Sequence, residues 1–164
     1  MRLIVLFTEV KQYQISFDVY GLMLYYAKKI DEAEASLLFK TTLSEYWYKT
    51  NNGYGAEGLT SDDEEVAILF NEIPNVINFI DMDILPSLIL EVDGIMQKYG
   101  GTLSFDALFR NEPGFTEDIF LDDDYQEDNA DIYSKGQIIR FFEYLRDFLQ
   151  FTLGNHIRYR VFVD

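Results

Sequence analysis

The chain of 164 residues has the length of one ordinary domain, and a chain of this length can bury roughly 70% of the surface that it exposes when unfolded. Its hydrophobic content of 48% and aromatic content of 16% exclude an extended acidic tail, because disordered acidic chains have too few apolar side chains to form a core. The net charge of -16 disfavours binding to the phosphates of nucleic acid or to anionic membrane lipids, and the lack of cysteine excludes disulfides, thiolate metal ligands and thiol catalysis.

The first expected elements are one strand followed by helices. Residues 2–8 form a short apolar run rich in Ile, Val and Phe, which predicts a buried β-strand. Residues 17–49 contain no Pro and no Gly after Gly21, and their apolar side chains recur near the helical period. We expect two helices there, or one helix that is broken near Asp31. The Asn- and Gly-rich residues 50–60 predict a loop.

The middle of the chain gives conflicting signals. Residues 61–64 have the form of a capping box with acids in the first helical turn, and they favour a helix that begins there. Residues 66–70 are apolar and could instead form a strand. Residues 75–81 are also short and apolar and follow Pro74, and for them we favour a strand over a helix.

Two amphipathic helices are expected in the second half of the chain. Residues 85–99 place apolar side chains on one face, with Pro86 in the first turn and Gly100 and Gly101 at the end. Residues 134–153 have a wide apolar face and are followed by a glycine. Both apolar faces are expected to pack into the core.

The last residues, 157–163, alternate between polar and apolar side chains for most of their length and predict a strand. Its two arginines, Arg158 and Arg160, could form a small basic patch with Arg140 and Arg146, but we favour surface charges and local ion pairs on the final helix and strand. The whole pattern predicts an α+β fold, a mostly helical domain with short terminal β-strands packed against amphipathic helices. No linker or repeat is found, so residues 1–164 are assigned to a single acidic interaction domain.

The negative charge is concentrated in the middle of the chain. Residues 1–49 carry as many bases as acids, and residues 135–164 have a net charge of +2. Residues 50–134 carry 20 acids and only two bases, Lys98 and Arg110, which gives this part a net charge of -18. Repulsion among like charges opposes compactness, so we expect a charge of this size to serve steering, solubility or a basic partner.

The segment 112–131 has the clearest binding pattern, because nine acids are interleaved there with aromatic and aliphatic residues and no base is present. A charged run of this kind is most often a solvated loop. Acids with aromatic anchors also suit the cationic groove of a nuclease, where carboxylates take the place of phosphates and rings that of bases. We assign partner binding to Glu117, Asp118, Asp122, Asp123, Asp124, Tyr125, Glu127, Asp128 and Asp131.

The sequence contains no catalytic, metal or cofactor motif that we can identify. The single histidine, His156, follows a helix-ending Gly-Asn pair and is interpreted as a turn or strand-start residue. Glycine patterns that bind phosphates are lacking. A calcium loop starting at Asp122 fails, because Glu127 stands where glycine is required and Tyr133 where the bidentate glutamate is required. We therefore expect no cofactor, no metal and no catalytic residue.

Small size, strong acidity, high aromatic content and the lack of cysteine make the chain similar to bacterial immunity proteins that neutralise nuclease toxins. The resemblance is one of composition and carries over no residue. It implies a non-catalytic protein that inhibits a basic toxin or nuclease domain by covering its active or nucleic-acid-binding surface. Two alternatives stay open. One is a DNA-mimic inhibitor of nucleic-acid enzymes, and the other is a hydrolase that uses a carboxylate pair, which sequence alone cannot select from 29 acids.

The sequence also predicts where the protein works. Arg2 is the only base before the first apolar run, no small-residue cleavage site follows, and no uninterrupted apolar run approaches the length of about 18 residues typical of a span. We expect neither a secretory signal peptide nor a membrane span. The predicted location is cytoplasmic, with which the lack of cysteine is compatible.

Overall fold

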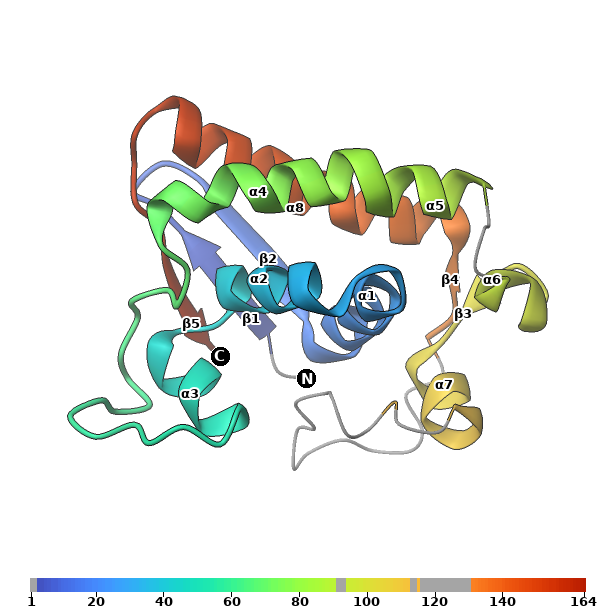
Figure 1. Ribbon diagram of the computed structural model, residues 1–164, viewed down its shortest axis with the longest axis horizontal. Coiled ribbons are helices and arrows are strands. Elements are labelled where there is room, and N and C mark those ends of the chain that lie inside the picture. Colours follow the sequence, from blue (N-terminus) through green and yellow to red (C-terminus); the bar gives the residue numbers. More distant parts are fainter. Residues whose placement is uncertain (1–2, 91–93, 113–114, 116–130) are drawn as a thin grey trace.

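The computed structural model describes residues 3–90, 94–112, 115 and 131–164. They form an α+β fold, which confirms the expected class (Figure 1). The helices are α1 (Phe17–Ile30), α2 (Glu32–Thr42), α3 (Glu45–Asn51), α4 (Ile73–Phe79), α5 (Leu85–Leu90), α6 (Ile95–Lys98), α7 (Phe105–Asn111) and α8 (Lys135–Gly154), with a 3-10 turn η1 (Phe70–Glu72) and a π-helical turn η2 (Ile80–Ile84). The strands are β1 (Leu3–Phe7), β2 (Gln12–Ser16), β3 (Thr102–Leu103), β4 (Tyr133–Ser134) and β5 (Arg160–Val163).

The main sheet brings the two ends of the chain together. Its strand order is β2-β1-β5 and all pairs are antiparallel, so the first and last strands are neighbours. Leu3 and Asp164 exchange two backbone hydrogen bonds, at 3.3 and 2.9 Å. Both predicted terminal strands are confirmed, although the last begins at Arg160 rather than at residue 157. β2 was not predicted, although its side chains alternate between exposed and buried as in a half-buried strand.

Asp31 separates α1 from α2, as predicted. Its backbone N–H donates to the Ala27 carbonyl at the end of α1, and its carboxylate accepts from the Glu34 N–H at the start of α2, at 3.0 Å. One residue thus ends one helix and caps the next. The shorter helix α3 follows after Ser44, whose hydroxyl accepts from the Trp47 N–H.

The helix expected from the capping-box sequence does not form, and this prediction is wrong. Residues 64–67 are extended: the Glu45 N–H donates to the Glu65 carbonyl at 2.8 Å, and the Val161 N–H donates to the Glu64 carbonyl at 2.9 Å. Backbone pairing with segments distant in the sequence therefore overrides the local helix signal. The alternative strand over residues 66–70 does not form either, because only Val66 takes part in an isolated bridge and Phe70 begins η1.

Residues 75–81 are helical, so the favoured strand assignment is wrong. They belong to a helical run from α4 through η2 to α5, in which buried side chains recur at helical spacing. The run packs against α1, α2 and α8, which explains why it is so apolar. A short window of such a helix has the composition of a buried strand.

The helix expected over residues 85–99 is divided. Pro86 lies inside the helical run, directly after the π-helical turn in which the Leu85 N–H donates to the Ile80 carbonyl. The wider turn relieves the clash that a proline ring makes with the carbonyl four residues earlier in a regular α-helix. α6 is a separate helix that follows Gly94, whose φ of 69° is left-handed and suits glycine.

The stretch Phe70–Lys98 is long and apolar enough, by length and composition alone, to cross a membrane. Its mean hydropathy reaches 1.4 in the relevant window, of which 44% is buried inside the protein. Because the core helix of a soluble protein passes the same test, this stretch is only weak support for a membrane span.

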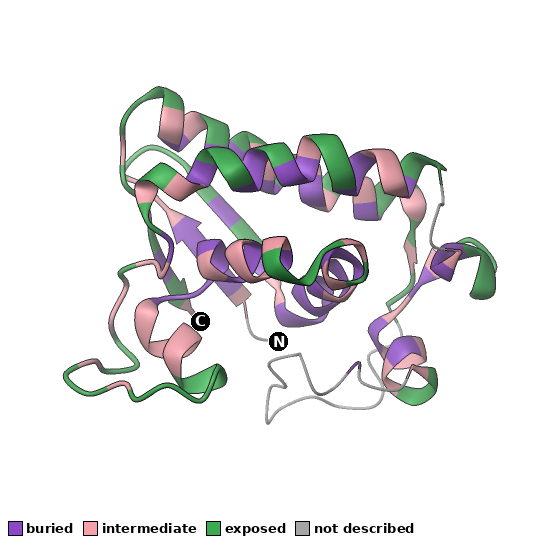
Figure 2. Cartoon of the chain, in the orientation of Figure 1, coloured by how far each residue is buried: buried purple, intermediate pink, exposed green. Residues whose placement is uncertain are grey.

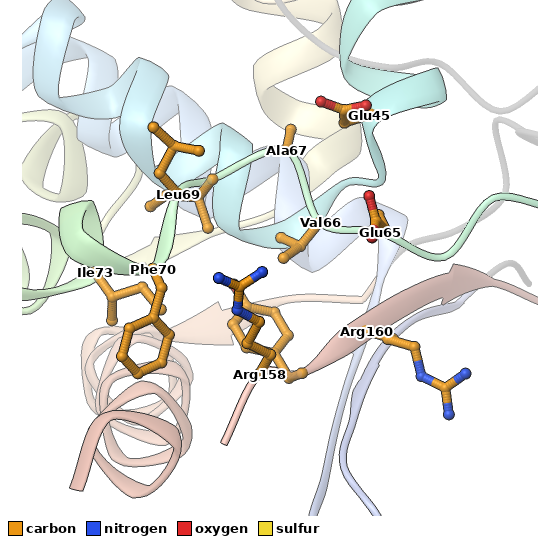
Figure 3. Close-up of a pocket in the computed structure, with 11 residues that line it drawn as sticks. Glu45, Glu65, Val66, Ala67, Leu69, Phe70, Ile73, Arg158 and Arg160 are labelled. Carbon is orange, nitrogen blue, oxygen red and sulfur yellow. The ribbon is translucent and has the colours of Figure 1, made fainter. Parts of the chain in front are cut away.

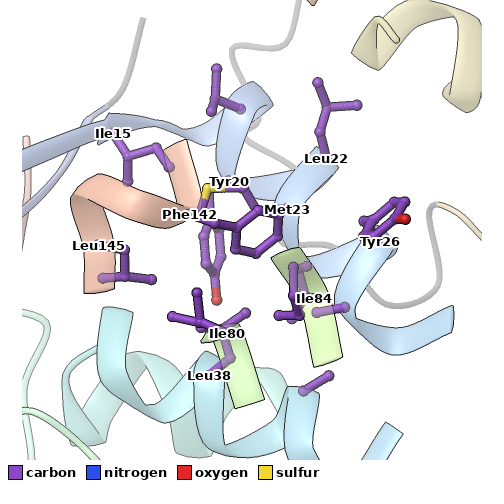
Figure 4. Packing of buried hydrophobic residues seen from close by; sticks show 14 of the residues in the cluster. Ile15, Tyr20, Leu22, Met23, Tyr26, Leu38, Ile80, Ile84, Phe142 and Leu145 are labelled. Carbon is purple, nitrogen blue, oxygen red and sulfur yellow. The ribbon is translucent and has the colours of Figure 1, made fainter. Parts of the chain in front are cut away.

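The core lies between the sheet, α1, α2, the run from α4 to α5, and α8 (Figure 1). In the run from α4 to α5 and in α8, buried residues alternate with exposed residues along the helix, whereas residues 17–24 of α1 are all buried (Figure 2). Figure 4 shows Tyr20 and Met23 of α1 meeting Leu38 of α2, Ile80 of η2 and Phe142 of α8. The apolar faces predicted for residues 134–153 and for the first half of 85–99 are therefore buried as expected.

Candidate partner-binding surface

Most of the predicted partner-binding residues lie outside the part of the chain that the structure describes. These are Glu117, Asp118, Asp122, Asp123, Asp124, Tyr125, Glu127 and Asp128. Asp131 is described, and it is exposed just before β4. The residues that flank the acidic segment on each side give the described geometry of this candidate site.

Glu112 marks the start of the acidic segment. Its carboxylate accepts hydrogen bonds from the Lys98 ammonium and the Tyr99 hydroxyl, both at 2.7 Å, and from the Tyr25 hydroxyl at 3.4 Å. The bonds from Lys98 and Tyr99 lower the pKa of Glu112, whose side chain is 10% exposed. Burial, together with the nearby carboxylate, raises the pKa of Tyr99 to about 12. Glu112 therefore connects α6, α7 and α1.

Phe115 is a second anchor at this end. Its side chain is 0% exposed, and its ring centroid lies 5.1 Å from that of Tyr25 and 5.0 Å from that of Phe105 in edge-on contacts. Its backbone N–H donates to the Glu112 carbonyl at 3.3 Å. An aromatic residue at the start of the segment is thus held between α1 and α7.

The other end of the segment is held by strand pairing and by a helix cap. Thr102 and Leu103 of β3 pair with Ser134 and Tyr133 of β4. The Ser134 hydroxyl accepts from the Gln137 N–H and the Gln137 side chain accepts from the Ser134 N–H, which completes a capping box at the predicted start of α8.

Tyr133 connects this end to α1. Its hydroxyl donates to the Asp18 carboxylate at 3.4 Å, and its ring contacts the ring of Phe141 with 5.4 Å between centroids. Burial, followed by the charges of Asp18 and Asp131, raises the pKa of Tyr133, so the phenol stays protonated. Since Tyr25 and Asp18 both belong to α1, the described residues on both sides of the acidic segment contact the same helix.

The only two bases of residues 50–134 are both in local ion pairs. Lys98 lies 2.7 Å from Glu112, and Arg110 lies 3.0 Å from Asp106 one turn away on α7. Each base is thus partnered by an acid of the same part of the chain. No further base within residues 50–134 is present to offset the charge of the remaining acids.

The structure agrees with the interpretation of the C-terminal arginines as surface charges and local ion pairs. Arg146 contacts Asp81 at 2.9 Å, and Arg160 contacts Glu64 at 3.1 Å. Arg140 and Arg158 are exposed surface charges and make no ion pair with the residues that the structure describes. Arg158 also lines a pocket with Arg160, Glu45 and Glu65, which was not predicted (Figure 3).

His156 lies in the turn between α8 and β5, with a φ of 51°, which confirms its assignment to a turn. Within the described ranges, no three His, Asp or Glu side chains are arranged to hold a metal ion. The chain gives no significant match to any protein-family model, curated protein or solved structure. Its function therefore has to be argued from its own residues.

Proposed function

We propose that this protein is an acidic inhibitor that binds a basic protein partner, and specifically an immunity protein that neutralises a bacterial toxin of the nuclease type. The observation that carries the proposal is the net charge of -18 over residues 50–134, which the ion pairs of Asp81 with Arg146 and of Glu64 with Arg160 offset only in small part. Here 20 acids stand against two bases, and acids of the same region hold both bases. A nuclease needs a cationic surface to hold phosphates, and this charge is complementary to such a surface.

The inhibitor would act by covering the cationic groove of its partner rather than by catalysis. Carboxylates of the acidic segment would take the place of phosphates, and rings such as that of Tyr125 would take the place of bases. Complementary charge increases the association rate more than it slows dissociation, and it makes the association rate sensitive to salt. The proposed place of action is the cytoplasm, where a nuclease toxin meets nucleic acid.

The anchors on α1 support this proposal. Glu112 and Phe115 hold one end of the acidic segment, and Tyr133 holds the other. A segment with both ends fixed has fewer conformations to lose on binding than a free tail. The interactions with the partner therefore do not have to offset the entropy cost of ordering a long free chain end.

The test is co-expression with a basic nuclease encoded beside this protein. We expect the two to copurify in a 1:1 complex, the cells to survive, and the association rate to fall as salt is raised. A purified protein that neither copurifies with the nuclease nor protects the cells would contradict the proposal. A protein with the acids at Glu9, Glu32 and Glu34 changed to Gln is the control, because these positions lie in the neutral first part of the chain.

The same experiment separates the two alternatives. A DNA mimic would inhibit several unrelated basic enzymes and would compete with duplex DNA for each of them, whereas an immunity protein inhibits one toxin. A hydrolase would turn over a substrate without any partner. The pocket in Figure 3 contains Glu45 and Glu65, but both side chains are open to solvent and lack the enclosed setting of a paired-acid catalytic site.

A further inference from the structure

A pocket with a volume of about 390 Å³ lies where residues 65–70 diverge from β5 (Figure 3). The Val161 N–H donates to the Glu64 carbonyl, and beyond this point the chain turns away toward η1. Tyr159 forms part of the wall and is held in place, because its hydroxyl donates to the Thr41 carbonyl at 2.7 Å. The pocket is therefore preformed, and its volume falls in the range of small-ligand sites, about 300–1,000 Å³.

One wall of the pocket is apolar. Val66, Leu69, Phe70 and Ile73 line it, and Leu69 is 65% exposed. Leu69 is exposed beside the half-buried Phe70, and binding of an apolar ligand that removes these side chains from water is favourable. This wall suits an alkyl chain or an aromatic ring.

Arg158 supplies the polar group. Its guanidinium lies at the pocket near Val66, whereas that of Arg160 points away from it (Figure 3). Arg110, Arg146 and Arg160 each form an ion pair at 3.1 Å or less. In a chain with 29 acids, Arg158 makes no ion pair with the described residues, so its donors can serve a ligand.

We infer that this pocket binds an apolar monocarboxylate, with the carboxylate on Arg158 and the apolar body against Leu69 and Phe70. A single charge is favoured over a phosphate, because Glu45 and Glu65 line the same pocket and repel a dianion. The chemistry is shared by free acids, such as a medium-chain fatty acid, and by the C-terminus of an apolar peptide. This site lies apart from the acidic segment and does not depend on the proposed inhibitor function.

The test titrates the full chain with octanoate, octan-1-ol and octylamine, and with N-acetyl-Leu-Leu as its free acid and its amide, while NMR follows backbone amides. We expect octanoate or the free-acid peptide to shift the signals of Val66, Leu69 and Arg158 selectively. Whichever of these two ligands binds more tightly identifies the source of the carboxylate, a free acid or a peptide C-terminus. R158Q should weaken binding by about tenfold or more, since the charge-assisted hydrogen bonds to the carboxylate are lost.

The matched control is R140Q, because Arg140 is an exposed arginine on α8 that also lacks an ion pair among described residues and lies outside the pocket. R140Q should bind octanoate as the unchanged protein does. L69N should weaken the acid and the alcohol alike through loss of the apolar contact. Equal binding of octanoate by R158Q and R140Q, equal binding of octan-1-ol and octanoate, or no shift at the pocket with either acid would overturn the inference.

Discussion

Lys98 and Glu112 join the short helix α6 to the end of α7, with 2.7 Å between the ammonium and the carboxylate. The same carboxylate accepts from the hydroxyls of Tyr99 and Tyr25, so a single acid connects three helices. Because the acidic segment begins at this residue, the position of its first turn depends on this group of hydrogen bonds. Its charge therefore has a structural role that differs from that proposed for the acids after it.

Replacing Glu112 with Gln should lower the free energy of unfolding by about 1–2 kcal/mol at neutral pH, because charge-assisted hydrogen bonds are lost. The pKa of Glu112 is lowered in the folded protein, so its contribution is full above the unfolded value and is lost as pH falls through the folded value. The difference between the two proteins should thus shrink on acidification. Urea unfolding at several pH values measures it. D106N is the control, since the exposed pair of Asp106 with Arg110 should contribute only about 0.3–0.5 kcal/mol.

Phe115 should be the most costly single position near the acidic segment. Phe115→Ala removes a fully buried ring from its contacts with Tyr25 and Phe105, and we expect a loss of about 3–5 kcal/mol. Phe115→Leu keeps most of the volume and should lose less. Thermal and urea unfolding compare the two variants. A loss near zero for the alanine variant would show that this ring does not hold the segment to α1.

Tyr20 and Tyr159 are both buried in the core but differ at their hydroxyls. Tyr159 donates to the Thr41 carbonyl, whereas the Tyr20 hydroxyl, beside Thr42, has no partner of good geometry among the described residues. We expect Tyr20→Phe to raise the free energy of unfolding by about 1 kcal/mol and Tyr159→Phe to lower it by a similar amount. Equilibrium unfolding at neutral pH tests the pair, and changes of the same sign would contradict the reasoning.

Burial raises the pKa of both phenols, which adds a pH dependence to the same pair. A raised folded pKa means that the stability is fully present below the unfolded value, near pH 10, and is lost as pH rises further. Each phenylalanine variant removes one such group. Both should therefore lose stability less steeply above about pH 10 than the unchanged protein.

The sequence was sufficient to predict helices and strands where local signals and tertiary packing agree. Asp31 caps a helix, Ser134 begins one, and the terminal strands are apolar runs of strand length, so each was found. The predictions were wrong where backbone pairing came from distant segments, as at Glu65. They were also wrong where a window of seven residues was too short to show the helical period of a longer run, as in α4, whose exposed Asn75 and Asn78 lie between buried residues. In both cases the deciding residues lie outside the short segment itself.

The candidate site could be predicted only in part from the sequence, for the same reason. Charge counting locates the acidic segment, but not the pairing of Lys98 with Glu112, which depends on how α6 and α7 turn back on each other. Arg158 and Arg160 look equivalent in sequence, two residues apart on one predicted strand. The structure pairs Arg160 with Glu64 and leaves Arg158 at the pocket, a difference that depends on the path of residues 64–70.

The proposed binding role of the acidic segment is tested most directly by removing its charge. A variant with Asp122, Asp123, Asp124, Glu127 and Asp128 changed to Asn or Gln should keep its fold and be as stable as the unchanged protein or slightly more so, because like-charge repulsion is relieved. Its association with the basic partner should slow by on the order of tenfold at low salt if these acids act by steering. A larger effect on dissociation would place them inside the interface.

Stopped-flow kinetics at two salt concentrations, together with thermal melting, separate these outcomes. The control changes five acids elsewhere, Glu9, Glu32, Glu34, Glu57 and Asp164, to Gln or Asn and should alter the rates much less. If the affinity of the five-fold segment variant is unchanged, the acids are a solvated surface and the proposed contact lies elsewhere.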